Sequence, residues 1–184
     1  HCAHSVAFNR GKRSIALDLK SPDGIAVVKK IAAKAEAEAI KNKWNVVIAI
    51  LDDGGNLVYL QKMDGTQIGS IAVAQAKGST AIKFKRPSKV FEDGVAGGRN
   101  ALLALPGATP VEGGLPLIVD NVYIGAIGVS GVTSAQDGQI AAAGVSAGRS
   151  SCAGDAVSGA GGRVPAAGER RGPGGRLADA ERGQ

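Results

Sequence analysis

The stretch LPGATPVEGGLPLIVDNVYIGAIGVSGVTS, residues Leu105–Ser134, decides much of the fold. It joins a polar, glycine-rich loop to two apolar runs that are separated by Asp120 and Asn121. Such a pair favours a tight turn between antiparallel strands, because Asn and Asp tolerate unusual backbone conformations. The stretch therefore predicts a β-hairpin over 115–130. The loop before it has few side chains, so a ligand could approach its backbone closely.

An earlier segment predicts a second hairpin. Asn45–Leu51 is apolar and β-branched, the cluster DDGGN follows it, and Leu57–Met63 resumes a strand pattern. Asp52 and Asp53 could form a pair of carboxylates, but their place before two glycines favours a turn-forming role. The glycines of the later hairpin, Gly125, Gly128 and Gly131, do not open a helix. They are therefore interpreted as close packing or a bulge rather than as a dinucleotide motif.

Helices are predicted on both sides of the hairpins. The first starts at Ser21-Pro22-Asp23 and buries a stripe of Ile, Val and Ala. The others are expected over 68–85, 93–103 and 134–145, the last with a capping-box-like start from Ser134 to Asp137. Hairpins that alternate with helices indicate an α+β fold, in which helices cover an antiparallel sheet.

The composition divides the 184 residues into three parts. Residues 1–24 form an N-terminal extension and residues 25–147 form the folded domain. Residues 148–184 are a Gly/Ala/Arg-rich tail without apolar periodicity, which we expect to be disordered because it cannot bury enough surface to offset its ordering entropy.

Charge and composition limit the classes of partner. The net charge is +6, but the lysines end at Lys89 and six arginines lie in the tail, so no single basic face is indicated and nucleic-acid binding is not expected. No apolar run approaches the roughly 20 residues of a membrane span, and no signal segment opens the chain. We therefore expect a cytoplasmic protein without a membrane partner. Cys2 and Cys152 are the only cysteines, and they suggest neither a disulfide framework nor structural zinc.

Several ordered motifs together resemble the GlcG/HbpS/PduO C-terminal family. They are LDDGGNLV, MDGTQIGS, AIKFKRPSKVF, LPGATPVEGGLP and IGAIGVSGVTSAQD, and they span about residues 24–145. The resemblance implies a profilin-like fold with a five-stranded antiparallel sheet flanked by helices, usually in homo-oligomers. Some members bind haem, so haem is the cofactor that the resemblance suggests.

The resemblance also implies site residues. The HbpS-type loop carries a threonine as the expected iron contact, and Thr109 occupies the matching position. The PduO-type domain uses a histidine near the start of its first helix, where this chain has none, and His1 and His4 precede the domain. The cationic side chains near the loop could pair with haem propionates or another small carboxylate. The alternative is a solvated helix end whose cations favour the helix dipole. These side chains are Lys83, Lys85, Arg86 and Lys89.

A short N-terminal stretch has a different resemblance. The sequence NRGKRSIALDLKSPDG, residues 9–24, is similar to the N-terminal motif of family III CoA-transferases. Nothing in residues 25–184 resembles the part of those enzymes that carries their aspartate nucleophile. We therefore expect no CoA-transferase activity.

Three functions stay open from the residues. The first is binding of a small ligand, with haem held weakly through Thr109. The second is an accessory protein or enzyme of a catabolic pathway, with Glu112 as acid or base on a small organic acid. The third is a structural homo-oligomer without a ligand. Thr109 and Glu112 could also simply stabilise a tight turn. The domain contains neither His nor Cys, which disfavours nucleophilic or redox catalysis and leads us to expect binding.

Overall fold

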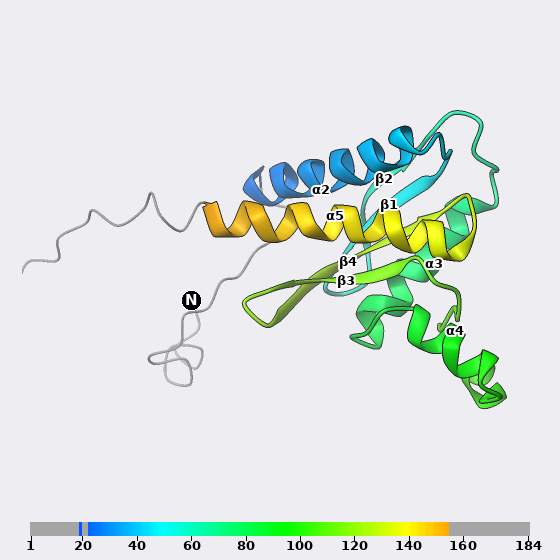
Figure 1. The fold of residues 1–184 in the computed structure, drawn as a ribbon. Helices are drawn as coiled ribbons and strands as arrows, with labels where there is room; N and C mark the ends of the chain where they lie inside the picture. The colour runs from blue at the N-terminus through cyan, green and yellow to red at the C-terminus, as the bar shows by residue number, and fades with distance from the viewer. Residues whose placement is uncertain (1–18, 20–21, 155–184) are drawn as a thin grey trace, which may run out of the picture.

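The computed structural model describes residue 19 and residues 22–154 (Figure 1). Within this part of the chain, a single antiparallel sheet holds four strands in the order β2-β1-β4-β3. The strands are β1 (Val47–Asp52), β2 (Leu57–Lys62), β3 (Gly114–Val119) and β4 (Val122–Ser130). The prediction of an α+β fold is confirmed. The expected fifth strand is absent from the described residues, because the remaining segments there form helices or short loops.

Both predicted hairpins are confirmed. β1 pairs with β2 and β3 pairs with β4, and the two hairpins join along β1 and β4. Asp120 and Asn121 have φ angles of 48° and 63°, as a tight turn between right-twisted strands requires. Every residue of β1 is buried, as expected for a central strand that is covered on both faces.

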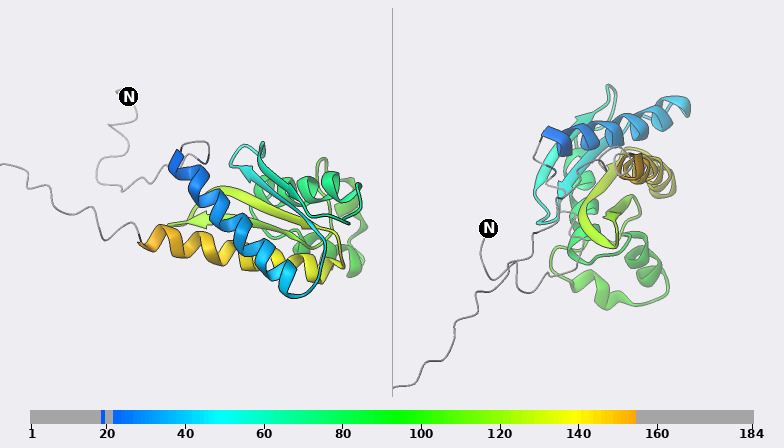
Figure 2. Two further views of the ribbon diagram at one scale, coloured as in Figure 1. Left: turned by 90° about the horizontal axis from the view of Figure 1, so that it is seen from above. Right: turned by 90° about the vertical axis from the view of Figure 1, so that its left-hand side faces the viewer.

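Helices cover both faces of the sheet (Figure 2). On one face, α2 (Pro22–Lys41) and α5 (Ser134–Gly154) lie side by side and pack on Ile48 and Ile50. On the other, α3 (Ser70–Lys83) packs through Ala74 on Val47, Ala49 and Leu51. The two faces of β1 therefore belong to two separate apolar layers.

The helix predicted over 93–103 is wrong in its bounds. The structure has α4 (Lys89–Ala96) followed by a 3₁₀ turn, η1 (Asn100–Ala104). Gly98 has a φ angle of 89° and ends the helical path. Leu102 of η1 then folds back over Gly94, where a side chain larger than hydrogen would meet the Leu102 methyl group.

The start of α5 also differs from the predicted motif. Thr133 and Gln136 form the reciprocal capping contacts, with Thr133 N–H donating to Gln136 Oε1 at 3.2 Å and Gln136 N–H donating to Thr133 Oγ1 at 3.4 Å. Asp137 instead points into the protein. The helix extends to Gly154, beyond the predicted end at Val145. The expectation of disorder is therefore wrong for residues 148–154, which continue α5. Residues 155–184 of the tail, and nearly all of the N-terminal extension, lie outside the described part of the chain.

Candidate functional site

The loop between η1 and β3, residues 105–113, is fixed by hydroxyl groups from the α3–α4 region. The Thr109 backbone N–H donates to Thr80 Oγ1 at 2.8 Å. Ser88 Oγ donates to the Val111 carbonyl at 2.7 Å and accepts from the Gly114 N–H at 2.9 Å. Thr80 and Ser88 are fully buried, so these bonds replace water for the loop backbone. We refer to residues 105–113 as the 105–113 loop.

Thr109 occupies the middle of this loop and is half-buried. Its N–H bonds Thr80, and its carbonyl accepts from the Val111 N–H at 2.9 Å. Within the described residues, its side-chain hydroxyl makes no hydrogen bond. The backbone of Thr109 is thus held in place by hydrogen bonds in which its hydroxyl takes no part. The role of Thr109 as an iron contact stays a prediction.

Glu112 lies at the end of the loop and is engaged by a lysine. Lys89 Nζ is 3.1 Å from Glu112 Oε2 and 3.2 Å from Asp93 Oδ1. The hydrogen bond to Glu112, followed by the one to Asp93, raises the pKa of Lys89 above its ordinary value. The predicted cationic cluster and the predicted acid–base residue are therefore joined at this point, and Lys89 is committed to carboxylates of the protein.

The four predicted cations do not converge on one ligand. Lys83 is exposed and extends to Gly107, where its Nζ is 3.6 Å from the position of an added Cβ. Lys85 Nζ lies 5.5 Å from the ring centroid of Tyr123, and Lys89 binds Glu112. Two of the predicted cations therefore contact the 105–113 loop, Lys83 at Gly107 and Lys89 at Glu112. Of these two, Lys89 is the one that binds a carboxylate of the described residues.

The Arg86 side chain packs in a different place from the other three predicted cations. Its Nε donates to the Phe84 carbonyl at 3.1 Å, and its guanidinium carbon lies 5.8 Å from the centroid of Phe91. Sequence spacing could not predict this divergence, because Lys85 has a φ angle of 51° and so turns the chain just after α3 ends.

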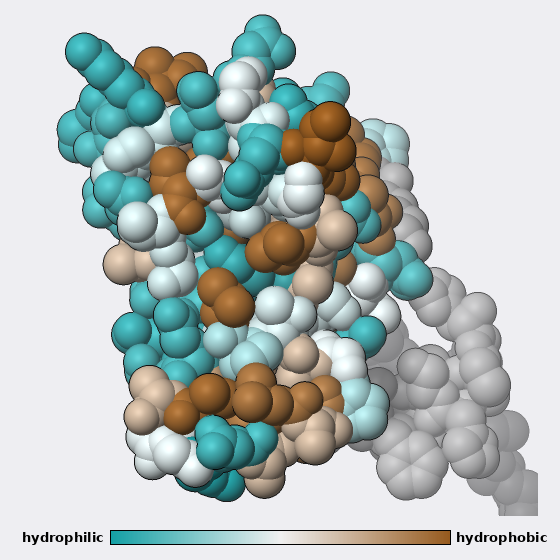
Figure 3. Space-filling view, turned by 90° about the vertical axis from the view of Figure 1, so that its right-hand side faces the viewer, coloured by the Kyte–Doolittle hydropathy of each residue, from teal (hydrophilic) through white to brown (hydrophobic). Residues whose placement is uncertain are grey.

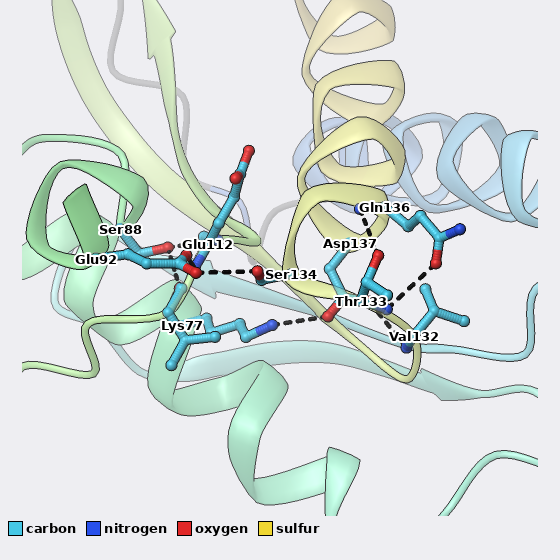
Figure 4. A network of polar contacts seen from close by, with 11 residues as sticks. Lys77, Ser88, Glu92, Glu112, Val132, Thr133, Ser134, Gln136 and Asp137 are labelled. Carbon is cyan, nitrogen blue, oxygen red and sulfur yellow. Dashed lines mark hydrogen bonds and ion pairs between the residues drawn. The ribbon is translucent and has the colours of Figure 1, made fainter. Parts of the chain in front are cut away.

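A buried ion pair lies beneath the loop, and sequence reasoning missed it. Lys77 Nζ of α3 is 2.7 Å from Asp137 Oδ2 of α5, and both side chains are only 2% exposed (Figure 4). Burial raises the pKa of Asp137, and the hydrogen bond and charge of Lys77 oppose that rise. One signal could have found Lys77: it falls on the apolar stripe of α3, between Ala74 and Ala81.

The glycines that end the loop allow it to pass over this pair. A Cβ at Gly113 would lie 3.0 Å from both Lys77 Nζ and Asp137 Cβ, and Gly113 has a φ angle of 126°. A Cβ at Gly114 would collide with the Lys77 backbone carbonyl. The glycines here serve internal packing rather than the approach of a ligand.

Glu92 is a further contact residue that the sequence did not reveal. One of its carboxylate oxygens accepts from the Glu112 backbone N–H, and the other accepts from Ser134 Oγ at 3.0 Å (Figure 4). Glu92 belongs to α4, so its carboxylate connects α4, the loop and the start of α5. The side chains of Glu92 and Lys77 approach the loop from different helices, and together they define its position.

The structure confirms two of the structural interpretations. Asp52 accepts from the Asn56 backbone N–H at 2.8 Å and from its side-chain amide, as a turn-forming residue does. Gly128 faces the Ala74 backbone carbonyl at a distance that leaves no room for a Cβ, so its role is close packing.

Two properties of the described residues bear on the kind of site. None of their helices is both long and apolar enough to cross a lipid bilayer. Their His, Cys, Asp and Glu side chains form no group of three or more suited to a metal ion. His1, Cys2 and His4 precede the described part of the chain.

Comparison with known proteins gives consistent matches. A family model described as haem degrading protein HbpS-like matches residues 25–146. Protein GlcG of Escherichia coli strain K12 is 44% identical over 100 residues, which cover 54% of this chain and 75% of GlcG. The match to the family model begins at residue 25, and these matches give no support to the resemblance of residues 9–24 to CoA-transferases.

Solved structures show the same architecture. The crystal structure of Klebsiella pneumoniae protein ORFY is similar with a TM-score of 0.63 and 27% identity, over 76% of this chain and 95% of ORFY. The crystal structure of a PduOC:haem complex is similar with a TM-score of 0.61 and 25% identity, over 66% of this chain and 91% of PduOC.

Proposed function

We propose that this chain, which belongs to the HbpS-like family, binds a small ligand at the 105–113 loop, with haem as the first candidate. The observation that carries the proposal is the Thr109 hydroxyl, which is presented on a fixed backbone without a hydrogen bond to another described residue. The PduOC:haem complex supports haem as the ligand to test first, because its protein shares the fold.

The residues at the loop fit a weakly held haem. The Thr109 hydroxyl offers iron a neutral oxygen, which binds more weakly than the imidazole or thiolate of most haem proteins. Lys83, beside Gly107, offers an ammonium group to a propionate. Bound haem would supply redox-active iron, and the chain's own groups would orient it and neutralise its acidic edge.

Stronger haem ligands are missing from the described residues. No histidine occurs there, and the half-buried Met63 packs against the apolar core. The cysteine that α5 contains lies in its last turn, whose side chains are outside the described set. These facts support reversible loading rather than permanent retention of haem.

The alternative role for Glu112 has less support. A general base must be free to take a proton from its substrate, whereas the Glu112 carboxylate is 3.1 Å from Lys89 Nζ. The contact favours Glu112 as the residue that positions Lys89. An enzymatic role on a small organic acid would require this ion pair to open.

We further propose that the protein acts as a homo-oligomer. Large apolar side chains are exposed on the single chain, among them Ile68 at 80% and Leu103 at 62%. Such side chains would be covered in an assembly of copies. Light scattering coupled to size-exclusion chromatography gives the mass in solution and tests this part of the proposal.

Titration with haem, followed by absorbance, tests the ligand. We expect a saturable Soret shift with the wild type, a smaller or absent shift with Thr109→Val, and a retained shift with Thr109→Ser. Valine matches threonine in shape and removes the hydroxyl, whereas serine keeps the hydroxyl. Equal binding by Thr109→Val and the wild type would contradict the role of Thr109, and no shift with the wild type would exclude haem.

A further inference from the structure

A hollow at the end of the molecule offers a binding site separate from Thr109. It lies between the end of α3, α4 and η1 and has a volume of about 240 Å³. Among the residues predicted to contact haem, Arg86 alone lines it. We call it the α4 hollow, and its lining residues are Phe84, Arg86, Val90, Phe91, Arg99, Leu102 and Leu105.

The walls of the α4 hollow are mainly apolar. The ring centroids of Phe84 and Phe91 are 5.1 Å apart, with an angle of 59° between the rings. Val90 is 47% exposed, and Leu102 and Leu105 add aliphatic side chains to the lining. Figure 3 shows a hydrophobic band across the end of the molecule that α4 and η1 form. Such walls suit a hydrocarbon body that leaves water.

Two guanidinium groups complete the hollow. Arg86 is held over the Phe91 ring and donates its Nε to the Phe84 carbonyl, which fixes the side chain beside the apolar wall. Arg99 lies between α4 and η1. Among the described side chains, no carboxylate forms an ion pair with Arg86 or Arg99. Guanidinium groups bind carboxylates through paired N–H donors, so these two cations favour an acidic ligand.

The volume limits the size of that ligand. An apolar cavity of about 150 Å³ holds a benzene molecule. A hollow of about 240 Å³ therefore has room for one ring and a short chain that ends in an acid group. We propose that the α4 hollow binds a monocarboxylic acid whose apolar body is the size of one aromatic ring, with its carboxylate on Arg99 and Arg86. This site does not depend on haem binding at Thr109.

Isothermal titration of the full chain with 3-phenylpropionate tests the proposal. We expect saturable binding, with at least tenfold weaker binding of 3-phenylpropanol, which has the same body without the charge, and of acetate, which has the charge without the body. Arg99→Gln should weaken 3-phenylpropionate binding by about tenfold or more, since a charged hydrogen bond is removed. Lys30→Gln, a loss of one exposed positive charge on α2, should leave it unchanged.

A second variant tests the hollow itself. Val90→Trp should fill the space from its exposed rim and abolish binding of the acid, while circular dichroism reports whether the fold is kept. Absence of 3-phenylpropionate binding to the wild type would overturn the proposal. So would equal binding of the acid and the alcohol, or retained binding in a folded Val90→Trp protein. The comparison of ligands on the wild type decides the matter even if Arg99→Gln fails to fold.

Discussion

Lys77 and Asp137 are 60 residues apart in sequence, and their side chains meet at 2.7 Å in a fully buried ion pair. The pair connects α3 with the first turn of α5, and the 105–113 loop passes directly over it through Gly113. The position of the loop, and with it the position of Thr109, therefore depends on two residues that contact no ligand in either proposal.

Removal of one partner of this pair should destabilise the protein strongly. We expect Lys77→Met to lower the free energy of unfolding by about 3–5 kcal/mol, because Asp137 would be left as an unpaired buried carboxylate. Urea denaturation measures the loss. Lys89→Met, which breaks exposed ion pairs instead, is the control and should change stability little. A loss no larger than that of the control would contradict the importance of burial.

The double variant Lys77→Met with Asp137→Leu should recover much of that loss. Apolar side chains of similar volume often replace a buried ion pair at no net cost, because neither charge then has to be desolvated. The same denaturation experiment gives the coupling energy of the two positions. Equal losses in the single and double variants would show that the pair contributes through packing rather than through charge.

The stability of the protein should depend on pH in the direction expected for a carboxyl group whose pKa is raised on folding. Burial raises the pKa of Asp137 above its ordinary value of 3.8, so the folded state binds this proton more tightly than the unfolded state. Between 3.8 and the raised pKa, the contribution of Asp137 to stability must therefore fall as pH rises. The difference in unfolding free energy between the wild type and Asp137→Asn, measured at several pH values in this range, gives the slope of the Asp137 contribution against pH. A slope of opposite sign would mean that Lys77 outweighs burial.

A methyl group at Gly114 should distort the loop. Gly114→Ala would place its Cβ against the Lys77 carbonyl, and we expect a loss of about 1–3 kcal/mol. Gly69→Ala is the matched control, since nothing lies within 4 Å of its added Cβ and its φ angle of −57° suits alanine. Thermal unfolding compares the two. A similar melting temperature for both variants would show that the loop can move away from Lys77.

Loss of a charge at Glu92 should loosen the contact between α4, the loop and α5. Glu92→Gln replaces one carboxylate oxygen by an amide nitrogen, so the Glu112 N–H keeps at most a neutral acceptor, and the Ser134 hydroxyl can donate only if the remaining oxygen faces it. We expect a loss of about 1 kcal/mol and faster hydrogen exchange of the Glu112 amide. Asp53→Asn, at an exposed turn position, should leave that amide unchanged. Unchanged exchange in Glu92→Gln would contradict the bridging role.

Patterns among neighbouring residues correctly predicted the elements whose position depends on local sequence. The Asp120-Asn121 turn and the alternating apolar residues beside it predicted the second hairpin, and Pro22 predicted the start of α2. The fold class followed from the order of these elements. The end of α4 was harder, because Gly97 and Gly98 interrupt a pattern whose apolar residues continue into η1.

The candidate site was only partly visible in the sequence. Thr109 and Glu112 could be found because they are neighbours in one loop. The Lys77–Asp137 pair depends on how α3 and α5 meet, which no local pattern describes. The four cations looked like one cluster because they are close in sequence, but the turn at Lys85 sends them in different directions. The side-chain directions thus depend on a backbone conformation that composition does not reveal.

The sheet lies between α3 on one face and α5 on the other, yet Lys77 and Asp137 join these two helices directly. The two apolar layers therefore share a link that does not pass through the hydrogen bonds of the strands. If one apolar layer unfolded alone, the ion pair would break and the other layer would keep a buried charge without its partner. Heat should accordingly unfold the domain in a single calorimetric transition, with equal calorimetric and van't Hoff enthalpies, and the variant that lacks both charges is the one in which the layers could separate.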